Sequence, residues 1–215
     1  MIVTAIIPAF NEEHNIGAVL DTLTVSPLIS EIIVVSDGSE DNTVGVASAY
    51  EGVKVIELLA NRGKGGAVKA GLDNSSGTII VILDADLIGL QEEHIEALVH
   101  PILSGSAEMV TGVFEKGRPV TDLAQKVAPF LSGQRALERQ LLESISDIDL
   151  SRFGIEVALQ RYVDENAVKN ELVQLTQLSH VMKEEKLGLW KGVSARAKMY
   201  WEIIRYVTDN EIDQK

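Results

Sequence analysis

The chain has 215 residues, of which 46% are hydrophobic and 24% are charged, a composition typical of one globular domain. It has no cysteine, which excludes disulfides, thiolate zinc sites, iron–sulfur clusters and cysteine nucleophiles. The 32 acidic and 19 basic residues give a net charge of −13, which argues against nucleic acid as a general partner. An anionic substrate would have to be met locally, by a cationic side chain, backbone N–H groups or a metal ion.

The N-terminal apolar run ends at Pro8 and lacks a basic residue before it, so we expect no signal peptide. No stretch of the sequence reaches the roughly 18 apolar residues that a membrane span needs. We therefore expect a cytoplasmic protein.

Short apolar runs alternate with helical patterns over about the first 115 residues, which predicts an α/β domain. Runs rich in isoleucine and valine indicate parallel strands covered on both faces, and apolar residues three and four positions apart indicate amphipathic helices. We expect strands at 2–7, 32–35, 53–56, 79–83 and 107–114, and helices at 16–23 and 95–102.

Helical patterns dominate after Gly117, and no linker divides the chain. The sequence therefore predicts a single domain over 1–215, with halves 1–115 and 116–215 and a helical C-terminal extension. In the second half we expect helices near 136–144, 155–163 and 195–207, and one strand at 171–178.

Acidic residues and a glycine–lysine loop follow the first four predicted strands. In an open parallel sheet, ligands bind outside the carboxyl ends of the strands, so these segments should meet at one rim. They are Pro8–Glu13, Ser36–Ser39, Asn61–Gly66 and Asp84–Asp86.

Asp84 and Asp86 are two positions apart after an apolar strand, so their side chains should point the same way. Two carboxylates at a rim can hold a hard divalent cation, which keeps other positions for water and substrate phosphates. Such a cation stabilises a departing phosphate. The alternative is that Asp86 caps the next helix.

Asp37 ends an otherwise apolar strand, where its carboxylate could accept hydrogen bonds from a nucleobase. The neighbouring Ser39, Asp41 and Asn42 are explained as turn and N-cap residues. Glu12 and Glu13 stand at the N-terminus of the first predicted helix, where the helix dipole stabilises acids. Of these two, Glu12 lies nearer the strand end and could meet a ribose hydroxyl.

Lys64 lies in a glycine-rich segment, Gly63–Gly66, that opens a predicted helix. Glycines let a ligand approach the backbone closely, and a helix N-terminus favours anions. The spacing is not that of a Walker loop. The alternative is a glycine turn with a solvated lysine.

Three residues of the second half are further candidates. Arg135 could bind an anionic acceptor through its guanidinium fork or form a structural ion pair. Glu156 lies in a mostly apolar helix, where it could serve the acceptor or lie at the surface. His180 could complete a metal site begun by Asp86, and such a set would suit Mn²⁺ at least as well as Mg²⁺.

The four rim segments, in this order and each after an apolar strand, resemble the family 2 glycosyltransferases of the GT-A fold, a Rossmann-like, mostly parallel sheet flanked by helices. The resemblance covers about residues 1–115, the nucleotide-sugar-binding half, and leaves 116–215 as the acceptor half. It implies transfer of a sugar from a nucleotide diphosphate sugar, with a UDP-sugar favoured, to an acceptor that it does not identify and that could be anionic. It also implies a divalent cation (Mn²⁺ or Mg²⁺) as cofactor.

The resemblance also implies roles for individual residues. Lys64 and Gly65 would lie near the diphosphate, Asp84 would contact ribose or donor sugar, and Asp86 would ligate the metal. The residues around the base and ribose would be Pro8, Ala9, Phe10, Glu12 and Asp37.

Segments of the second half, Ser132–Ala136 and Gly154–Glu156, resemble the acceptor side of glucosyl-3-phosphoglycerate synthases, which also carry a late histidine on the metal. By this resemblance Gln134 and Arg135 would bind the acceptor, Glu156 would be a catalytic residue with Asp84 and Asp86, and His180 would join Asp86 on the metal.

Other interpretations stay open. From Lys183 to Arg205 there are six basic and three acidic residues, so this segment could touch an anionic membrane, or it could be a core or dimer helix. For the whole chain, the alternatives are a nucleotide-sugar-binding protein without activity and a polyprenyl-phosphate glycosyltransferase.

Overall fold

The computed structural model describes residues 1–114, 132–145 and 154–180, except for the side chain of His180. Residues Met1–Ser179 form one compact unit. The second unit, His180–Lys215, lies outside the described residues apart from the backbone of its first residue. The predicted helix at 195–207, and with it the C-terminal extension and its membrane or dimer contacts, therefore falls outside the description. The single domain over 1–215 stays a prediction.

Strands and helices alternate through the first 114 residues, as the apolar pattern predicts. The strands are β1 (Val3–Ala9), β2 (Glu31–Asp37), β3 (Val53–Leu58), β4 (Ile79–Ile82), β5 (Leu87–Ile88) and β6 (Met109–Phe114). The helices are α1 (Ile16–Leu23), α2 (Thr43–Ser48), α3 (Gly63–Asp73) and α4 (Glu92–Leu103). Later come β7 (Arg135–Glu138), α6 (Arg139–Glu143), α7 (Ile155–Asn166), β8 (Asn170–Leu175) and β9 (Ser179–His180).

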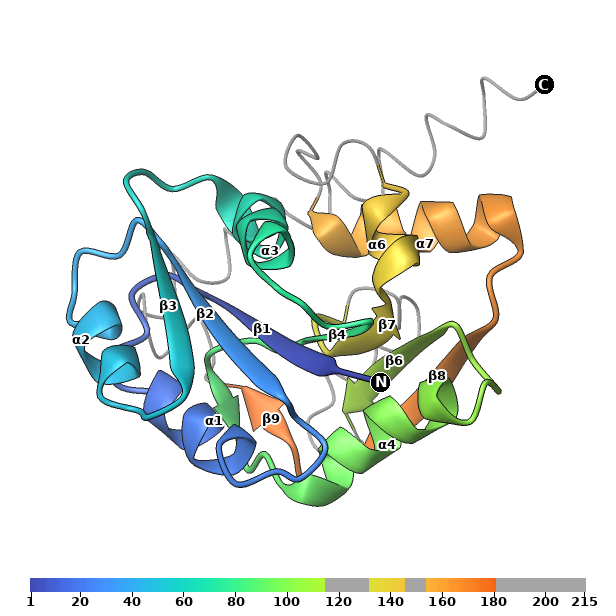
Figure 1. Ribbon diagram of the computed structural model, residues 1–215, viewed down its shortest axis with the longest axis horizontal. Coiled ribbons are helices and arrows are strands. Elements are labelled where there is room, and N and C mark those ends of the chain that lie inside the picture. The colour runs from blue at the N-terminus through green and yellow to red at the C-terminus, as the bar shows by residue number, and fades with distance from the viewer. Residues whose placement is uncertain (115–131, 146–153, 181–215) are drawn as a thin grey trace, which may run out of the picture. The chain divides into compact units, whose positions relative to one another are not determined.

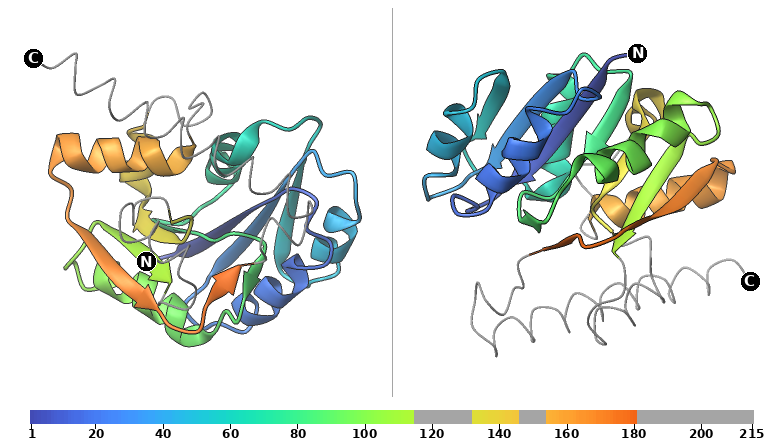
Figure 2. Two further views of the ribbon diagram at one scale, coloured as in Figure 1. Left: turned by 180° about the vertical axis from the view of Figure 1, so that it is seen from behind. Right: turned by 90° about the horizontal axis from the view of Figure 1, so that it is seen from below.

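A seven-stranded sheet in the order β3-β2-β1-β4-β7-β6-β8 forms the centre of the unit (Figure 1). Strands β1, β2, β3 and β4 are parallel, and β8 is parallel to β6. Viewed from behind, β8 lies at one edge of the sheet (Figure 2). The small strands β5 and β9 form a separate two-stranded sheet. The α/β class and the mostly parallel sheet are confirmed.

The prediction of a helix near 136–144 is wrong for its first residues. Ala136 and Leu137 lie in β7, which runs antiparallel to both β4 and β6. Both residues are fully buried, so packing between two strands outweighs the helical preference of this alanine- and leucine-containing segment. The helix α6 begins only at Arg139.

Helices cover both faces of the sheet (Figure 1). One core contains apolar residues of α1, α2 and α4 against alternate residues of β1, such as Ala5 and Ile7. The other contains residues of α3, α6 and α7 against Ile6 and its neighbours. This alternation follows from the two-residue period of a strand. Among the described residues, no helix has both the length and the apolar character to span a bilayer.

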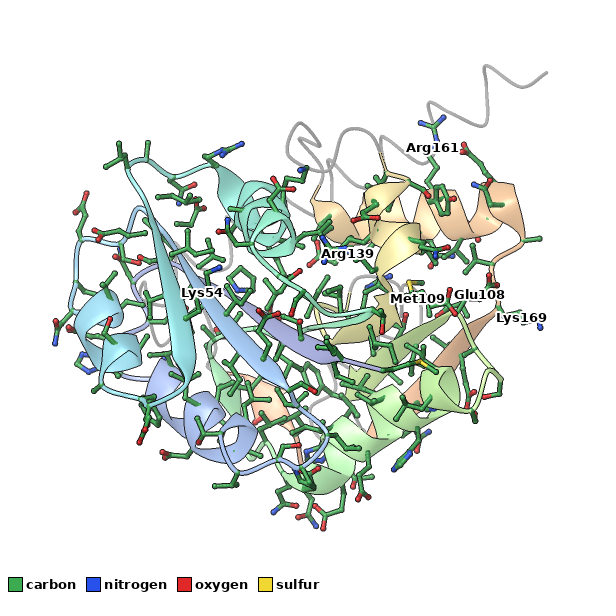
Figure 3. The ribbon with its side chains drawn as sticks, viewed as in Figure 1. Lys54, Glu108, Met109, Arg139, Arg161 and Lys169 are labelled. Atoms are coloured by element: carbon green, nitrogen blue, oxygen red, sulfur yellow. The ribbon has the colours of Figure 1, made fainter. Side chains whose placement is uncertain are left out.

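Arg139, labelled in Figure 3, joins β7 and α6 to the end of α3. Its Nη2 donates to the Leu72 carbonyl at 3.1 Å, and its Nη1 donates to the Ser75 carbonyl at 3.1 Å. A guanidinium there satisfies carbonyls at the negative end of the helix dipole. The contact fixes β7, and the residues just before it, against α3.

Gly71 lets α3 approach β1 closely. A Cβ built at this position would lie 2.5 Å from Cγ2 of Ile6, which is fully buried. Alanine would gain about 1 kcal/mol of helix propensity, but overpacking a core costs about 1–3 kcal/mol. The steric effect should therefore outweigh propensity.

We predict that Gly71→Ala lowers the free energy of unfolding by up to about 2 kcal/mol, because Ile6 and β1 must shift. Chemical denaturation followed by circular dichroism measures it. Gly17→Ala in α1 is the matched control, because the nearest atom to its added Cβ is the phenolic oxygen of Tyr50 at 3.2 Å, the end of a partly exposed side chain. Equal stabilities for the two variants would contradict the close approach of α3.

Candidate active site at the sheet rim

The carboxyl ends of β1 to β4 bring the four predicted segments to one rim, as expected from parallel strands. β7 adds a fifth segment. Because it runs antiparallel to β4, the residues that precede it, Ser132–Gln134, arrive at the same rim. Donor-side and acceptor-side candidates are thus neighbours.

The side chain of Lys64 lies at the centre of this rim between two carboxylates. Its Nζ is 2.6 Å from Oδ1 of Asp84 and 2.7 Å from Oε1 of Glu156. Lys64 comes from the first turn of α3, Asp84 follows β4, and Glu156 lies in the first turn of α7. The three side chains are 25%, 30% and 17% exposed, so solvent screens the ion pairs only partly. The alternative of a solvated lysine in a glycine turn does not fit this geometry.

Two opposing effects act on the pKa of Lys64. Burial alone would lower it, because the charged form loses water. The carboxylates of Asp84 and Glu156 outweigh burial and raise the pKa well above its usual value. Lys64 is therefore a fixed positive charge at any physiological pH, in a chain that is strongly acidic elsewhere.

Gln134 holds Asp84 in place from the other side. Its Nε2 donates to Oδ2 of Asp84 at 2.7 Å, and its Oε1 accepts from the Asp84 backbone N–H at 3.0 Å. Gly133 makes room for this arrangement, because a Cβ there would lie 2.5 Å from Oδ2 of Asp84 and would also clash with Nζ of Lys64. Sequence reasoning missed Gly133, whose role depends on side chains from two other segments.

Arg135 lies beneath the rim and not on its surface. It is 1% exposed, its Nε donates to the Ser132 carbonyl at 3.2 Å, and its Nη1 lies 3.6 Å from the sulfur of Met109. Burial lowers the pKa of Arg135 to about 10, although Glu156 acts in the opposite direction. The guanidinium thus stays charged at neutral pH, and its role in acceptor binding stays a prediction.

The loops after β1, β2 and β3 form the other side of the rim. Asp37 is 4% exposed, and its Oδ1 accepts the Arg62 backbone N–H at 2.7 Å. Gly38 has a φ of +73° and packs against the Ala60–Asn61 backbone, where a Cβ would lie 2.8 Å from the Asn61 nitrogen. The carboxylate of Asp37 is therefore held at a fixed place beside the loop that leads to Lys64.

The remaining donor-side candidates lie at the end of β1 and in the loop that follows it. Ala9 is buried, Pro8 is half-buried and Phe10 is 46% exposed. Oε2 of Glu12 accepts from the Asn15 amide group at 2.7 Å. The helix α1 begins at Ile16, so neither Glu12 nor Glu13 lies in its first turn. The positions of these two carboxylates are therefore fixed by their hydrogen bonds and not by the dipole of α1.

The chemistry of Asp86 fits a hard divalent cation. Its half-buried carboxylate follows β4 at the rim, two residues after Asp84. Within the described residues, no three acidic or imidazole side chains gather as a complete ligand set. Such a cation commonly keeps positions for water and for the phosphates of a substrate. The side chain of His180 falls outside the description, so its part in the site stays a prediction.

Comparison with known proteins identifies the family of this chain. The family model described as Glycosyl transferase family 2 matches residues 4–159. The chain is 42% identical over 98 residues to a dolichyl-phosphate beta-glucosyltransferase of Drosophila melanogaster, which is 39% of this chain and 30% of the relative. It is 34% identical over 194 residues to a glucosyl-3-phosphoglycerate synthase of Mycolicibacterium paratuberculosis, which is 73% of this chain and 58% of the relative.

Among solved structures, the chain is similar to glucosyl-3-phosphoglycerate synthase from Mycobacterium tuberculosis in complex with Mn²⁺, UDP-glucose and phosphoglyceric acid. The TM-score is 0.68 at 29% sequence identity, and the match covers 84% of this chain and 71% of that chain. The chain spans between about a third and three fifths of the length of these curated relatives. The predicted GT-A fold is confirmed, and the chain belongs to glycosyl transferase family 2.

Proposed function

We propose that the chain is a metal-dependent glycosyltransferase that moves glucose from UDP-glucose to an anionic acceptor. One observation carries this proposal: the Lys64 ammonium joins the donor half, through Asp84, to the acceptor half, through Glu156. A nonspecific structural ion pair would need only one of these carboxylates. The similar mycobacterial synthase, which was solved with Mn²⁺, UDP-glucose and phosphoglyceric acid, supports the choice of donor, cation and acceptor charge.

The proposed roles follow the position of each residue at the rim. Phe10, Pro8, Ala9, Glu12 and Asp37 would contact the base and ribose, and Lys64 with Gly65 would contact the diphosphate. Asp86 and His180 would hold a divalent cation, Mn²⁺ or Mg²⁺, which would neutralise charge on the diphosphate as it leaves. Asp84, Glu156, Gln134 and Arg135 would surround the transferred sugar and the acceptor.

In such a reaction, the bond between the sugar and the diphosphate breaks, and an acceptor hydroxyl forms the new bond to the same carbon. The hydroxyl proton must go to a base within hydrogen-bond reach. Glu156 is the candidate, but its carboxylate is held by Lys64 at 2.7 Å. A diphosphate offers Lys64 another anionic partner, so donor binding would release Glu156 for the acceptor.

A polyprenyl phosphate is the second candidate acceptor. The observation in its favour is the 42% identity over 98 residues to the dolichyl-phosphate beta-glucosyltransferase. Both acceptors carry a phosphate, and an acceptor screen with phosphoglyceric acid and a short polyprenyl phosphate separates them.

Donor choice is tested by calorimetric titration of UDP-glucose, GDP-mannose and the free nucleotides, each with and without Mn²⁺. We expect the cation to strengthen the binding of UDP-glucose and UDP, because a hard divalent cation takes ligands from the diphosphate as well as from the protein. Equal affinity for UDP-glucose with and without Mn²⁺ would contradict the cation site. Absence of binding by any nucleotide, in protein that melts cooperatively, would favour a chain without transferase activity.

The cation site is tested by Asp86→Asn. We expect turnover to fall by at least about a hundredfold, because loss of the cation removes several kcal/mol of charge stabilisation in the transition state. The melting temperature should stay close to that of the wild type, since the side chain is half-buried at the rim. Asp164→Asn on the exposed face of α7 is the matched control. Undiminished turnover in Asp86→Asn would overturn the assignment.

The role of Lys64 is tested by Lys64→Met. We expect affinity for UDP to fall at least about tenfold, because one charge-assisted contact to the diphosphate is lost. Lys69→Met in the same helix is the control, because the Lys69 side chain is 42% exposed and forms an ion pair with Asp73, one turn further along α3. Titration of both variants with UDP and Mn²⁺ measures the difference. Equal affinities would remove Lys64 from the donor site.

A further inference from the structure

The loop after β1 and the loop after β2 are joined by a reciprocal set of hydrogen bonds between side chains and backbone. Consecutive backbone amides of the first loop donate to side chains of the second loop and of Thr43, the first residue of α2. These contacts are Asn11 N to Ser39 Oγ at 3.1 Å, Glu12 N to Thr43 Oγ1 at 2.8 Å and Glu13 N to Asp41 Oδ2 at 3.0 Å.

The second loop returns two such bonds to the first. The Glu40 backbone N–H donates to Oδ1 of Asn11 at 2.8 Å, and the Asn42 backbone N–H donates to Oε2 of Glu13 at 2.8 Å. Each loop therefore provides side-chain acceptors for backbone N–H groups of the other. These N–H groups lie outside the helices and strands, so no regular secondary structure pairs them. Asn42 is the N-cap residue of α2 by position, as the sequence indicates, but its side chain makes no capping hydrogen bond.

Asp41 lies at the centre of this network. Its Oδ1 accepts the Thr43 backbone N–H at 3.0 Å and the Thr43 hydroxyl, while its Oδ2 accepts from Glu13. The Thr43 hydroxyl thus donates to Asp41 and accepts from Glu12, so both of its roles are used. Burial would raise the pKa of Asp41, but these hydrogen bonds outweigh it and lower the pKa, which keeps the acceptor ionised at neutral pH.

The network decides what the first loop can offer to a ligand. Asn11 has a φ of +56°, and successive amides around such a residue can form a concave site for anions. Here the amides of residues 11–13 are taken up by Ser39, Thr43 and Asp41. The loop is left to present side chains, among them the half-exposed Phe10, and not its amides.

We propose that Asp41 and Thr43 are positioning residues of the donor site, which hold the segment of Phe10 and Glu12 at a fixed spacing from Asp37. A nucleoside would bridge that spacing, so its affinity would depend on two side chains that do not touch it. This inference rests on the proposed nucleotide-sugar site. It assigns the nucleoside, and not the diphosphate, to the part of the site that the network controls.

The test compares UDP with inorganic pyrophosphate, each titrated with Mn²⁺ into the wild type, Asp41→Asn, Thr43→Val and Thr43→Ser. We expect Asp41→Asn and Thr43→Val to lower the affinity for UDP about tenfold, the equivalent of one charge-assisted hydrogen bond. The affinity for pyrophosphate should fall by less than about twofold. Thr43→Ser keeps the hydroxyl and should restore UDP affinity. Asp73→Asn, at an exposed position of α3, is the matched control.

A second measurement examines the network without any ligand. Hydrogen exchange followed by NMR should show faster exchange of the Glu12 and Glu13 amides in Asp41→Asn than in the wild type, while amides of β1 stay protected. Because this measurement uses Asp41→Asn, the network can still be tested if Thr43→Val does not fold.

The outcomes separate this inference from the proposed function. If the wild type binds no UDP, the proposed function and the inference fall together. If the wild type binds UDP and Asp41→Asn binds it equally well, only the inference falls. Equal weakening of UDP and pyrophosphate would also overturn it, because a general loss of folding affects both ligands.

Discussion

The ammonium of Lys64, held between Asp84 and Glu156, is the interaction on which the rest of the site depends. A chain with a net charge of −13 repels an anionic ligand, so one half-buried cation at the rim has a large local effect. The surrounding structure maintains this cation: Gln134 orients Asp84, and the absence of a side chain at Gly133 leaves the space that the ion pair occupies. The fold supports this arrangement through Arg139, which ties the β7 region to the end of α3.

Much of the donor side could be predicted from the sequence. Apolar strands identify the sheet, and parallel strands place their following loops at one rim, so Asp37, Lys64 and Asp84 were expected to be neighbours. The contact of Lys64 with Glu156 could not be predicted, because it depends on how α7 packs against α3. The same reason explains β7: Ala136 and Leu137 favour a helix locally, and only their burial between β4 and β6 makes them a strand.

The hydrogen bonds between the first two rim loops were missed for another reason. Ser39, Asp41 and Asn42 are residue types that commonly cap helices and form turns, so a local explanation was sufficient. Ser39 and Asp41 also accept from backbone amides of Asn11 and Glu13, and Asn42 donates its own backbone N–H to the Glu13 carboxylate, all of them about thirty positions away. A hydrogen bond from a distant backbone amide to a side chain produces no periodic pattern in the sequence. Because every residue except proline has a backbone N–H, the residue type at the donor is not constrained either, and a single sequence gives no sign of such bonds.

The direction of β7 has a consequence for how specificity can change. Strands β1 to β4 deliver the donor-side residues at their carboxyl ends, whereas β7 delivers Gly133 and Gln134 at its amino end, from a different stretch of chain. Two separate stretches of gene therefore encode the two sides of one rim. Under the proposed function, mutation or recombination confined to the later stretch would alter the acceptor side and leave the nucleotide subsite intact, provided that Gly133 and Gln134, which contact Asp84, were kept. A single ancestral scaffold could diversify its products in this way.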